Sequence, residues 1–103
     1  ANLGYLYENA VAQILTANGN ALFYHTFMNE STRRNYEIDF ILARKNKVCP
    51  IEVKSSGYKT HASLDAFSRK FSDRILDKYL IYTKDFAKDE DIFCLPTYLV
   101  QFL

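Results

Sequence analysis

Glycine is scarce in this sequence, and its scarcity excludes one common class of nucleotide-binding site. Only Gly4, Gly19 and Gly57 occur among the 103 residues. A P-loop requires the pattern Gly-x-x-x-x-Gly-Lys-Ser/Thr, because its glycines let backbone N–H groups wrap around phosphate. No such segment is present, so we expect no ATP binding through a P-loop in these residues.

Long apolar runs and charge of one sign are absent as well. The sequence has no run of eighteen apolar residues and no charged-then-apolar leader, so membrane insertion and secretion find no support. Thirteen Lys and Arg against twelve Asp and Glu give a net charge of +1, which produces no strong overall attraction to nucleic acid or to an anionic membrane. A basic patch can still exist locally.

Only two cysteines are present, and their spacing does not suit a metal site. Cys49 and Cys94 lie 45 positions apart on apolar segments. Structural zinc sites need closely spaced Cys or His ligands. The pattern favours two reduced core thiols in a cytoplasmic protein, with a disulfide as the alternative.

The apolar content is sufficient for one core. At 103 residues, 49% hydrophobic and 24% charged, the sequence predicts a single globular domain over residues 1–103. The opening residues "ANLGYLYENAV" lack a Met and are already helix-like. We therefore expect a piece of a longer protein.

Apolar periodicity predicts a helix followed by three strands. Between residues 3 and 17 apolar side chains recur at steps of three and four, and "NGN" at 18–20 supplies a stop. Three β-prone runs follow, at residues 21–28, 36–43 and 48–54. The last two are joined by "RKNK", a connection of hairpin length.

The second half of the sequence predicts a helix and two more strands. A short helix is expected over residues 61–73, and then "ILDKYLIYT" as a strand, "KDFAKDED" as a charged loop and "IFCL" as a short strand ended by Pro96. The tail "PTYLVQFL" is open between helix and strand. This order predicts an α/β sandwich with a mixed sheet.

The stretch "EIDFILARKNKVCPIEVKS", residues 37–55, carries charged groups on two otherwise apolar strands. If the hairpin has no bulge, residues whose numbers sum to 91 face each other. Asp39 then faces Glu52, and Glu37 faces Lys54, all on one face of the sheet. The other face carries an apolar surface, formed by Tyr36, Ile38, Phe40 and Leu42 with Cys49, Ile51 and Val53.

Two opposed carboxylates need a compensating positive charge, because Cβ atoms in such a pair lie about 4.5–5.5 Å apart. Mg²⁺ suits Asp39 and Glu52, since it takes carboxylate oxygens and keeps several waters. Lys54, on the same face, can stabilise negative charge on a phosphate. Glu8, at the margin of the first helix's apolar stripe, is a further candidate ligand and equally a candidate surface residue.

Structural roles account for the other polar and aromatic groups. For Glu37 alone, an ordinary cross-strand ion pair with Lys54 on a solvated sheet face is the favoured interpretation. His25 and His61 are assigned no role. Four aromatic residues are expected in the core or in an interface rather than in base stacking, namely Tyr5, Tyr7, Phe23 and Tyr24.

Asp39, followed by Pro50-x-Glu52-x-Lys54 on the next strand, resembles the Asp…(Asp/Glu)-x-Lys signature of the PD-(D/E)XK nuclease-like superfamily. The Pro-Asp pair of that signature is Ile38-Asp39 here, a common variation. The segments "GYLYENAVAQIL", "YEIDFILARKNKVCPIEVKSS", "SLDAFSRKF" and "IFCLPTYLV" resemble a nuclease-like domain of unknown function that follows an AAA+-type P-loop ATPase module in many prokaryotic proteins.

This resemblance implies a restriction endonuclease-like α/β/α sandwich with a central mixed β-sheet. It makes Asp39 and Glu52 ligands of Mg²⁺ or Mn²⁺, Lys54 the charge stabiliser and Glu8 an auxiliary ligand. It also implies DNA as the substrate and an AAA+-type ATPase module in the same longer chain. The function expected is Mg²⁺-dependent hydrolysis of DNA phosphodiester bonds.

The alternative is a catalytically silent module that binds nucleic acid or a protein and regulates the attached ATPase. Scattered basic residues would supply the phosphate contacts, or would simply form a solvated loop surface. These residues are Arg33, Arg34, Arg44, Lys45, Lys47, Lys59, Arg69 and Lys70.

Overall fold

A six-stranded mixed sheet forms the middle of the fold. The computed structural model describes residues 3–28, 35–55 and 60–103. Its elements are α1 (Leu3–Ala17), β1 (Phe23–Met28), β2 (Asn35–Arg44), β3 (Lys47–Val53), α2 (Ala62–Lys70), the 3₁₀ helix η1 (Ser72–Arg74), β4 (Lys78–Tyr82), β5 (Ala87–Asp89), β6 (Ile92–Pro96) and the 3₁₀ helix η2 (Thr97–Phe102). The strand order is β1-β2-β3-β4-β6-β5.

The sheet combines antiparallel and parallel pairs. β1, β2 and β3 pair antiparallel, β3, β4 and β6 pair parallel, and the edge strand β5 returns antiparallel to β6. The parallel step from β3 to β4 requires a crossover, which α2 supplies. The predicted α/β fold with a mixed sheet is confirmed.

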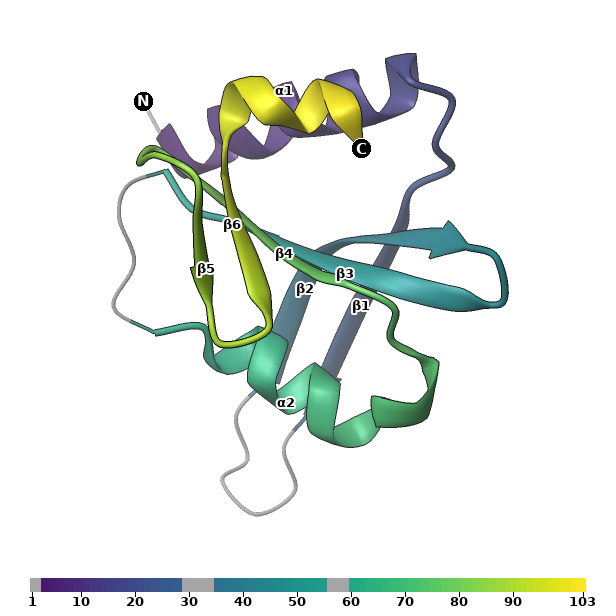
Figure 1. Cartoon of the computed structure of the whole chain (residues 1–103). Helices are drawn as coiled ribbons and strands as arrows, with labels where there is room; N and C mark the ends of the chain where they lie inside the picture. The colour runs from purple at the N-terminus through teal and green to yellow at the C-terminus, as the bar shows by residue number, and fades with distance from the viewer. Residues whose placement is uncertain (1–2, 29–34, 56–59) are drawn as a thin grey trace.

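Helices cover both faces of the sheet (Figure 1). On one face Val11 and Leu15 of α1 and Val100 of η2 pack on the strands, and on the other face Leu64 and Phe67 of α2 do so. Each helix therefore buries an apolar stripe against the sheet, as its spacing of apolar residues requires. No helix in the described part of the chain is long and apolar enough to cross a membrane.

The ends of α1 and η2 follow from local chemistry. Gly19 has φ +87°, a backbone conformation in which glycine carries no steric penalty, and the Asn20 side chain donates a hydrogen bond to the carbonyl of Leu15. Pro96, with φ −64°, precedes the first residue of η2. The tail that periodicity left open is therefore a 3₁₀ helix.

The register predicted for the β2–β3 hairpin is confirmed between Phe40–Ile51 and Arg44–Lys47, but the ladder does not reach the predicted pairs Asp39–Glu52 and Glu37–Lys54. The paired residues run from Phe40 with Ile51 to Arg44 with Lys47, and every pair sums to 91. Lys45 and Asn46 form the turn between the two strands. The two-residue period then places Phe40 and Leu42 with Cys49, Ile51 and Val53 in the core on the α1 side, as expected.

The expectation for Ile38 is wrong, because β2 contains a bulge. Phe23 pairs with Ile41 whereas His25 pairs with Ile38, so one residue of β1 stands opposite two residues of β2. The extra residue reverses the alternation at this point. Ile38 therefore packs with Leu64 and Phe67 on the α2 side.

Three other expectations need correction or completion. The charged segment predicted as a loop contains β5, and the helix predicted over residues 61–73 is divided into α2 and η1. Tyr5, Phe23 and Tyr24 are more than half exposed and do not belong to the core. Cys49 and Cys94 are buried and are not joined by a disulfide.

Candidate functional site

The bulge in β2 lies at Asp39. Tyr24 of β1 stands opposite Asp39 and Phe40, the two residues between the pairs that flank the bulge. Phe40 packs into the α1 side of the core while Ile38 and Ile41 pack on the α2 side. Bulges occur next to active sites because they re-aim a side chain. Here the re-aimed side chain is that of Asp39, which meets β3 and α1.

Asp39 is held by a backbone group of β3 and by a side chain of α1. The Val53 N–H donates to Asp39 Oδ2 at 2.7 Å, where the carboxylate takes the place of a strand partner. The side chain of Glu8 forms a hydrogen bond with the same carboxyl group. Two carboxyl groups form such a bond only when a proton lies between them. Asp39 and Glu8 therefore share a proton in this arrangement.

Burial is the main cause of the high pKa of Asp39. Burial, followed by the hydrogen bond with Glu8, raises the pKa of Asp39 from its ordinary 3.8 to about 8. The charges of Glu8 and Glu52 act in the same direction, whereas the hydrogen bond from Val53 opposes them. The Asp39 carboxyl is thus protonated at neutral pH when no cation is near.

Glu52 is a buried carboxylate with one oxygen unsatisfied. It is 5% exposed, and its Oε1 has no hydrogen-bond partner among the residues that the structure describes. Lys54 Nζ lies 3.8 Å from Glu52 Oε2. Burial raises the pKa of Glu52, and the positive charges of Lys54 and His61 partly offset that effect. A buried oxygen without a partner is energetically costly, so it marks a position where a cation would be stabilising.

Of the predicted site residues, Asp39 contacts Glu8, and Lys54 forms its ion pair with Glu52 rather than with Glu37. The prediction that Asp39 and Glu52 share one face of the sheet is wrong, because the bulge turns Asp39 toward Glu8 of α1, whereas Glu52 faces the α2 side. The charge of Glu52 still raises the pKa of Asp39. Glu37 is exposed on β2. The four candidate residues Glu8, Asp39, Glu52 and Lys54 thus come from α1, β2, β3 and the residue that follows β3.

Sequence reasoning missed a second polar cluster beside Glu52. The Nδ1 atom of His61 lies 2.9 Å from Asp65 Oδ1, and its Nε2 atom lies 3.2 Å from Asp89 Oδ2. Both ring nitrogens face carboxylates, an arrangement that favours the protonated imidazole, which can donate from both. Burial lowers the pKa of His61, but Asp65 and Asp89 outweigh burial and raise it above its ordinary value.

In the sequence, the one indication of this cluster is that Asp65 follows His61 by four residues, the spacing at which side chains of a helix can pair. The contact with Asp89 depends on β5, which lies far along the chain.

The donor groups suit a divalent cation, with one restriction. Among residues 3–28, 35–55 and 60–103, no three His, Cys, Asp or Glu side chains converge closely enough to enclose a metal ion. Mg²⁺ does not need such an enclosure, because it is commonly bound by one or two carboxylates and keeps its waters. Glu52 Oε1 and the carboxyl of Asp39 are the groups that would hold it, once Asp39 has lost its proton.

Comparison with protein families identifies the chain. The model of the family described as "Domain of unknown function (DUF4143)" matches residues 3–100. This chain belongs to the DUF4143 family. No curated protein matches it. The match covers the whole sheet and both α-helices of the DUF4143 domain, so the candidate site lies inside the family's own fold.

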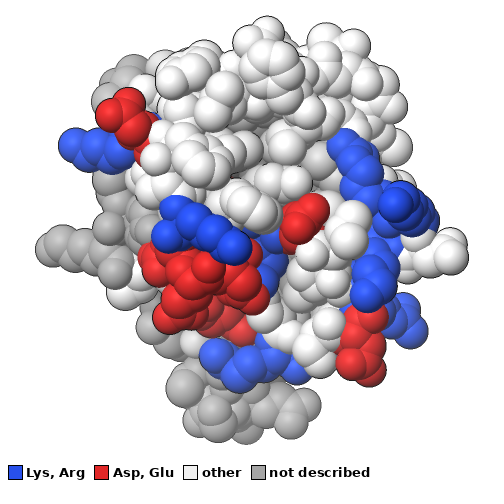
Figure 2. All heavy atoms as spheres, viewed as in Figure 1, with Lys and Arg blue, Asp and Glu red and all other residues white. Residues whose placement is uncertain are grey.

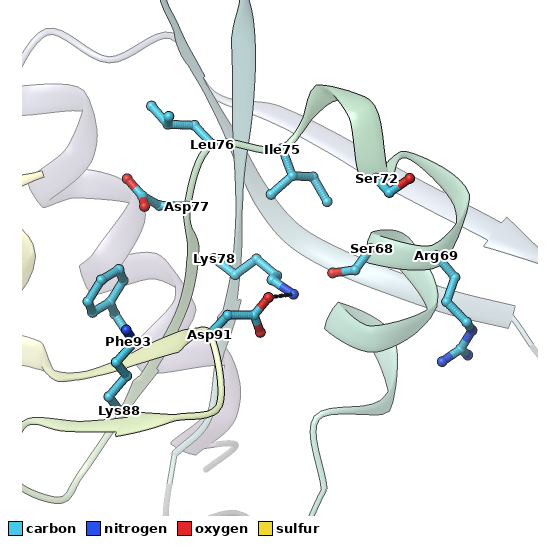
Figure 3. Close-up of a pocket in the computed structure, with 10 residues that line it drawn as sticks. All are labelled: Ser68, Arg69, Ser72, Ile75, Leu76, Asp77, Lys78, Lys88, Asp91 and Phe93. Atoms are coloured by element: carbon cyan, nitrogen blue, oxygen red, sulfur yellow. Dashed lines mark ion pairs between the residues drawn. The ribbon is translucent and has the colours of Figure 1, made fainter.

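A second concavity of the DUF4143 domain lies away from this site. It has a volume of about 650 Å³ and lies between α2 and η1 on one side and the first residues of β4 and β6 on the other (Figure 3). Lys78 Nζ and Asp91 Oδ2 form an ion pair of 2.6 Å inside it, and Lys88 lies over the ring of Phe93. Two of the cationic side chains that line the concavity, Lys78 and Lys88, therefore already have partners. The concavity contains none of the four candidate site residues, and of the basic residues predicted to contact phosphate it contains Arg69.

Charge is unevenly distributed on the surface of the DUF4143 domain. In Figure 2 the upper part of the molecule, where α1 and η2 lie, is almost uncharged, and Lys and Arg side chains gather on the side toward which the β2–β3 hairpin projects. α1 carries one charged residue, Glu8, and η2 carries none. The hairpin end carries Arg44, Lys45 and Lys47.

Proposed function

We propose that this DUF4143 domain is a Mg²⁺-dependent phosphodiesterase of the PD-(D/E)XK type that hydrolyses DNA. The observation that carries the proposal is the buried, unsatisfied oxygen of Glu52, next to Lys54 and within electrostatic reach of Asp39. Burying such a group costs free energy unless a ligand satisfies it. Lys54 pairs with the other oxygen of Glu52, so Oε1 is the atom left for a ligand.

Each residue has a distinct task in the proposed reaction. A bound divalent cation supplies Lewis-acid stabilisation of negative charge on the phosphate. Asp39 and Glu52 hold that cation through their oxygens, and Asp39 gives up its shared proton when the cation binds. Lys54, whose side chain is 39% exposed, reaches the solvent side and stabilises charge that develops on the phosphate. Glu8 positions Asp39 and serves as an auxiliary ligand.

We also propose a restriction endonuclease-like fold, an attached ATPase module and a cytoplasmic location. A restriction endonuclease-like arrangement is supported by a mixed sheet between helices with the acidic residues on two adjacent central strands. An AAA+-type ATPase module in the same longer chain is supported by the sequence resemblance. A cytoplasmic location is supported by two buried cysteines that form no disulfide, as a reducing compartment favours.

The test is cleavage of single- and double-stranded DNA in Mg²⁺ or Mn²⁺, with Asp39→Ala and Glu52→Gln as the active-site variants. The matched control is Asp73→Ala, since Asp73 is an exposed acidic residue on η1. We expect the control to cleave like the wild type and the two active-site variants to lose at least about 100-fold, because each variant removes a ligand of the cation that stabilises charge on the phosphate. Equal cleavage by all four proteins would refute the assignment.

One observation favours a second candidate function. Asp39 and Glu8 satisfy each other through a shared proton without any cation. The basic end of the β2–β3 hairpin offers phosphate contacts that require no metal. A catalytically silent module that binds nucleic acid or a protein and regulates the attached ATPase would have these features. Calorimetric titration of Mn²⁺ distinguishes the two, because the silent module would give no heat that depends on Asp39 and Glu52.

A further inference from the structure

Two exposed tyrosines flank Asp39, and together they indicate the form of nucleic acid that the site accepts. We infer that the substrate is a single strand, whose unpaired bases stack on Tyr5 and Tyr24 while its backbone passes Asp39 and Lys54. This inference rests on the proposed function for the reacting groups. The stacking contacts themselves require neither a metal nor cleavage.

Tyr5 lies at the wall of the Asp39 site. It is 62% exposed and, with Gly4, Glu8 and Val53, lines a hollow of about 280 Å³. Glu8 and Val53 are the two residues that hydrogen-bond to the Asp39 carboxyl. Tyr5 precedes Glu8 by almost one helical turn, which is about 5.4 Å along the axis. The ring therefore lines the same hollow as the groups that hold Asp39.

Tyr24 lies on the strand next to Asp39. It is 71% exposed and stands on β1 opposite the bulge that contains Asp39, across a strand spacing of about 4.8 Å. Its ring centroid lies 5.6 Å from that of Phe40, with the planes tilted by 59°. Phe40 is buried, so it anchors the Tyr24 ring without covering it.

The strand order puts the two rings on opposite sides of Asp39. β2 lies between β1, which carries Tyr24, and β3, which contributes Val53 to the hollow with Tyr5. A chain that stacks one base on each ring must therefore cross Asp39 between them.

Charge and stacking both favour a single strand over a duplex. A duplex keeps its bases stacked on one another, so it offers mainly phosphates to a protein surface. This chain has a net charge of only +1 and places Glu8 in the hollow, which disfavours binding through phosphates alone. Unpaired bases bind to aromatic rings without regard to sequence. Exposed tyrosines beside buried carboxylates supply affinity that the weak positive charge does not.

The absence of tryptophan from the sequence makes a direct test available. Tyr5→Trp and Tyr24→Trp each introduce a single fluorophore, which a stacked base quenches. The matched control is Phe102→Trp, because Phe102 is 75% exposed and lies near the other end of α1, where Asn18 donates to the carbonyl of Gln101. Oligo(dT), oligo(U) and a duplex are titrated into each variant in EDTA, so that neither cleavage nor a metal contributes.

We expect oligo(dT), oligo(U) or both to quench the fluorescence of the Tyr5→Trp and Tyr24→Trp variants and to leave that of the Phe102→Trp variant unchanged. The oligomer that binds more tightly identifies the strand as DNA or RNA. Equal quenching of all three variants, quenching by the duplex alone, or no quenching at saturating concentrations would overturn the inference.

Fluorescence anisotropy of a labelled single strand measures binding a second time, with variants that carry no introduced tryptophan. Tyr5→Ala and Tyr24→Ala should each weaken binding about tenfold, whereas Tyr5→Phe, Tyr24→Phe and Phe102→Ala should bind like the wild type. Unchanged binding by both alanine variants overturns the inference even if the tryptophan variants misfold.

The two proposals fail in different ways. Tyrosine-dependent binding without Asp39-dependent cleavage refutes the phosphodiesterase and supports the stacking surface. Asp39-dependent cleavage of a duplex by both alanine variants at the wild-type rate supports the phosphodiesterase and refutes the stacking surface.

Discussion

At the scale of single residues, a shared proton is the main feature of the candidate site. Asp39 accepts from the Val53 N–H and forms a hydrogen bond with Glu8, and its pKa is raised to about 8. At neutral pH a carboxyl in this environment is held mainly in its protonated form. The same environment becomes favourable for the ionised form when a cation arrives. Proton and cation therefore compete for one position.

The pH dependence of stability follows from the Asp39 pKa. Between about pH 4 and pH 8 the folded protein holds a proton that the unfolded chain has released, because the pKa falls from about 8 to 3.8 on unfolding. The free energy of unfolding of the metal-free protein should therefore decrease as pH rises through this range. The Asp39→Asn variant should lose much of that decrease and melt at a higher temperature than the wild type at pH 8.5.

Asparagine suits the position because its oxygen can accept from the Val53 N–H and its amide can donate to Glu8. Thermal melts in EDTA at pH 5, 7 and 8.5 measure the effect, with Asp73→Asn as the control on an exposed acid. A gain of 1 kcal/mol corresponds to about 4–8 °C in a domain of this size. An unchanged slope with pH in Asp39→Asn would show that Asp39 is not the titrating group.

At the scale of elements, two features connect segments that lie apart in the chain. The bulge in β2 aims Asp39 toward α1 and β3. His61 joins the start of α2 to β5 through Asp65 and Asp89. The edge strand β5 has three residues and, within the described part of the chain, pairs only with β6, so a contact from α2 adds a second attachment. His61 therefore contributes to the stability of that edge in a pH-dependent way.

His61→Gln should destabilise the protein more at pH 5.5 than at pH 9. The pKa of His61 is raised in the folded state by Asp65 and Asp89, so its contribution is fully present below the ordinary pKa of 6.5 and is lost as pH rises through the folded value. Both carboxylates are partly exposed, which limits the effect to about 1 kcal/mol. Chemical denaturation at the two pH values measures it.

Lys70→Gln, which removes an exposed cation from the same helix, is the control for His61→Gln. A loss of stability that is the same at pH 5.5 and pH 9 would contradict an electrostatic role for His61. It would leave only the packing of its ring.

At the scale of the whole molecule, the sheet separates two cores. One lies under α1 and η2, and the other lies under α2. Cys49 belongs to the first core and Cys94 to the second. Side chains on opposite faces of one sheet cannot approach as a disulfide requires. The alternative of a disulfide is therefore excluded by the architecture.

Thiol labelling tests this separation. In the native protein neither cysteine should react rapidly with a thiol reagent, because both are buried and burial raises the pKa of Cys49. In denaturant without reductant, two thiols per chain should react at once. A count of zero under those conditions would contradict the two-core arrangement, and Cys49→Ser and Cys94→Ser variants would assign each thiol.

The sequence by itself determined the parts of the fold that depend on neighbours in the chain. The two-residue period and the short connection set the hairpin register from Phe40–Ile51 to Arg44–Lys47, because both are local. The stripe on α1 likewise predicted which side of the helix packs on the sheet. β5 was not predicted, since its three charged and small residues become a strand only when β6 lies beside them.

Only the tertiary structure decided where Asp39 points and what lies around Glu52. The bulge exists because β1 pairs with β2 in two registers, a fact that the hairpin residues do not contain. The contacts of Asp39 with Glu8, and of His61 with Asp89, join segments more than twenty positions apart. Side-chain patterns record what each segment needs to bury, whereas protonation and metal affinity depend on which segments the fold brings together.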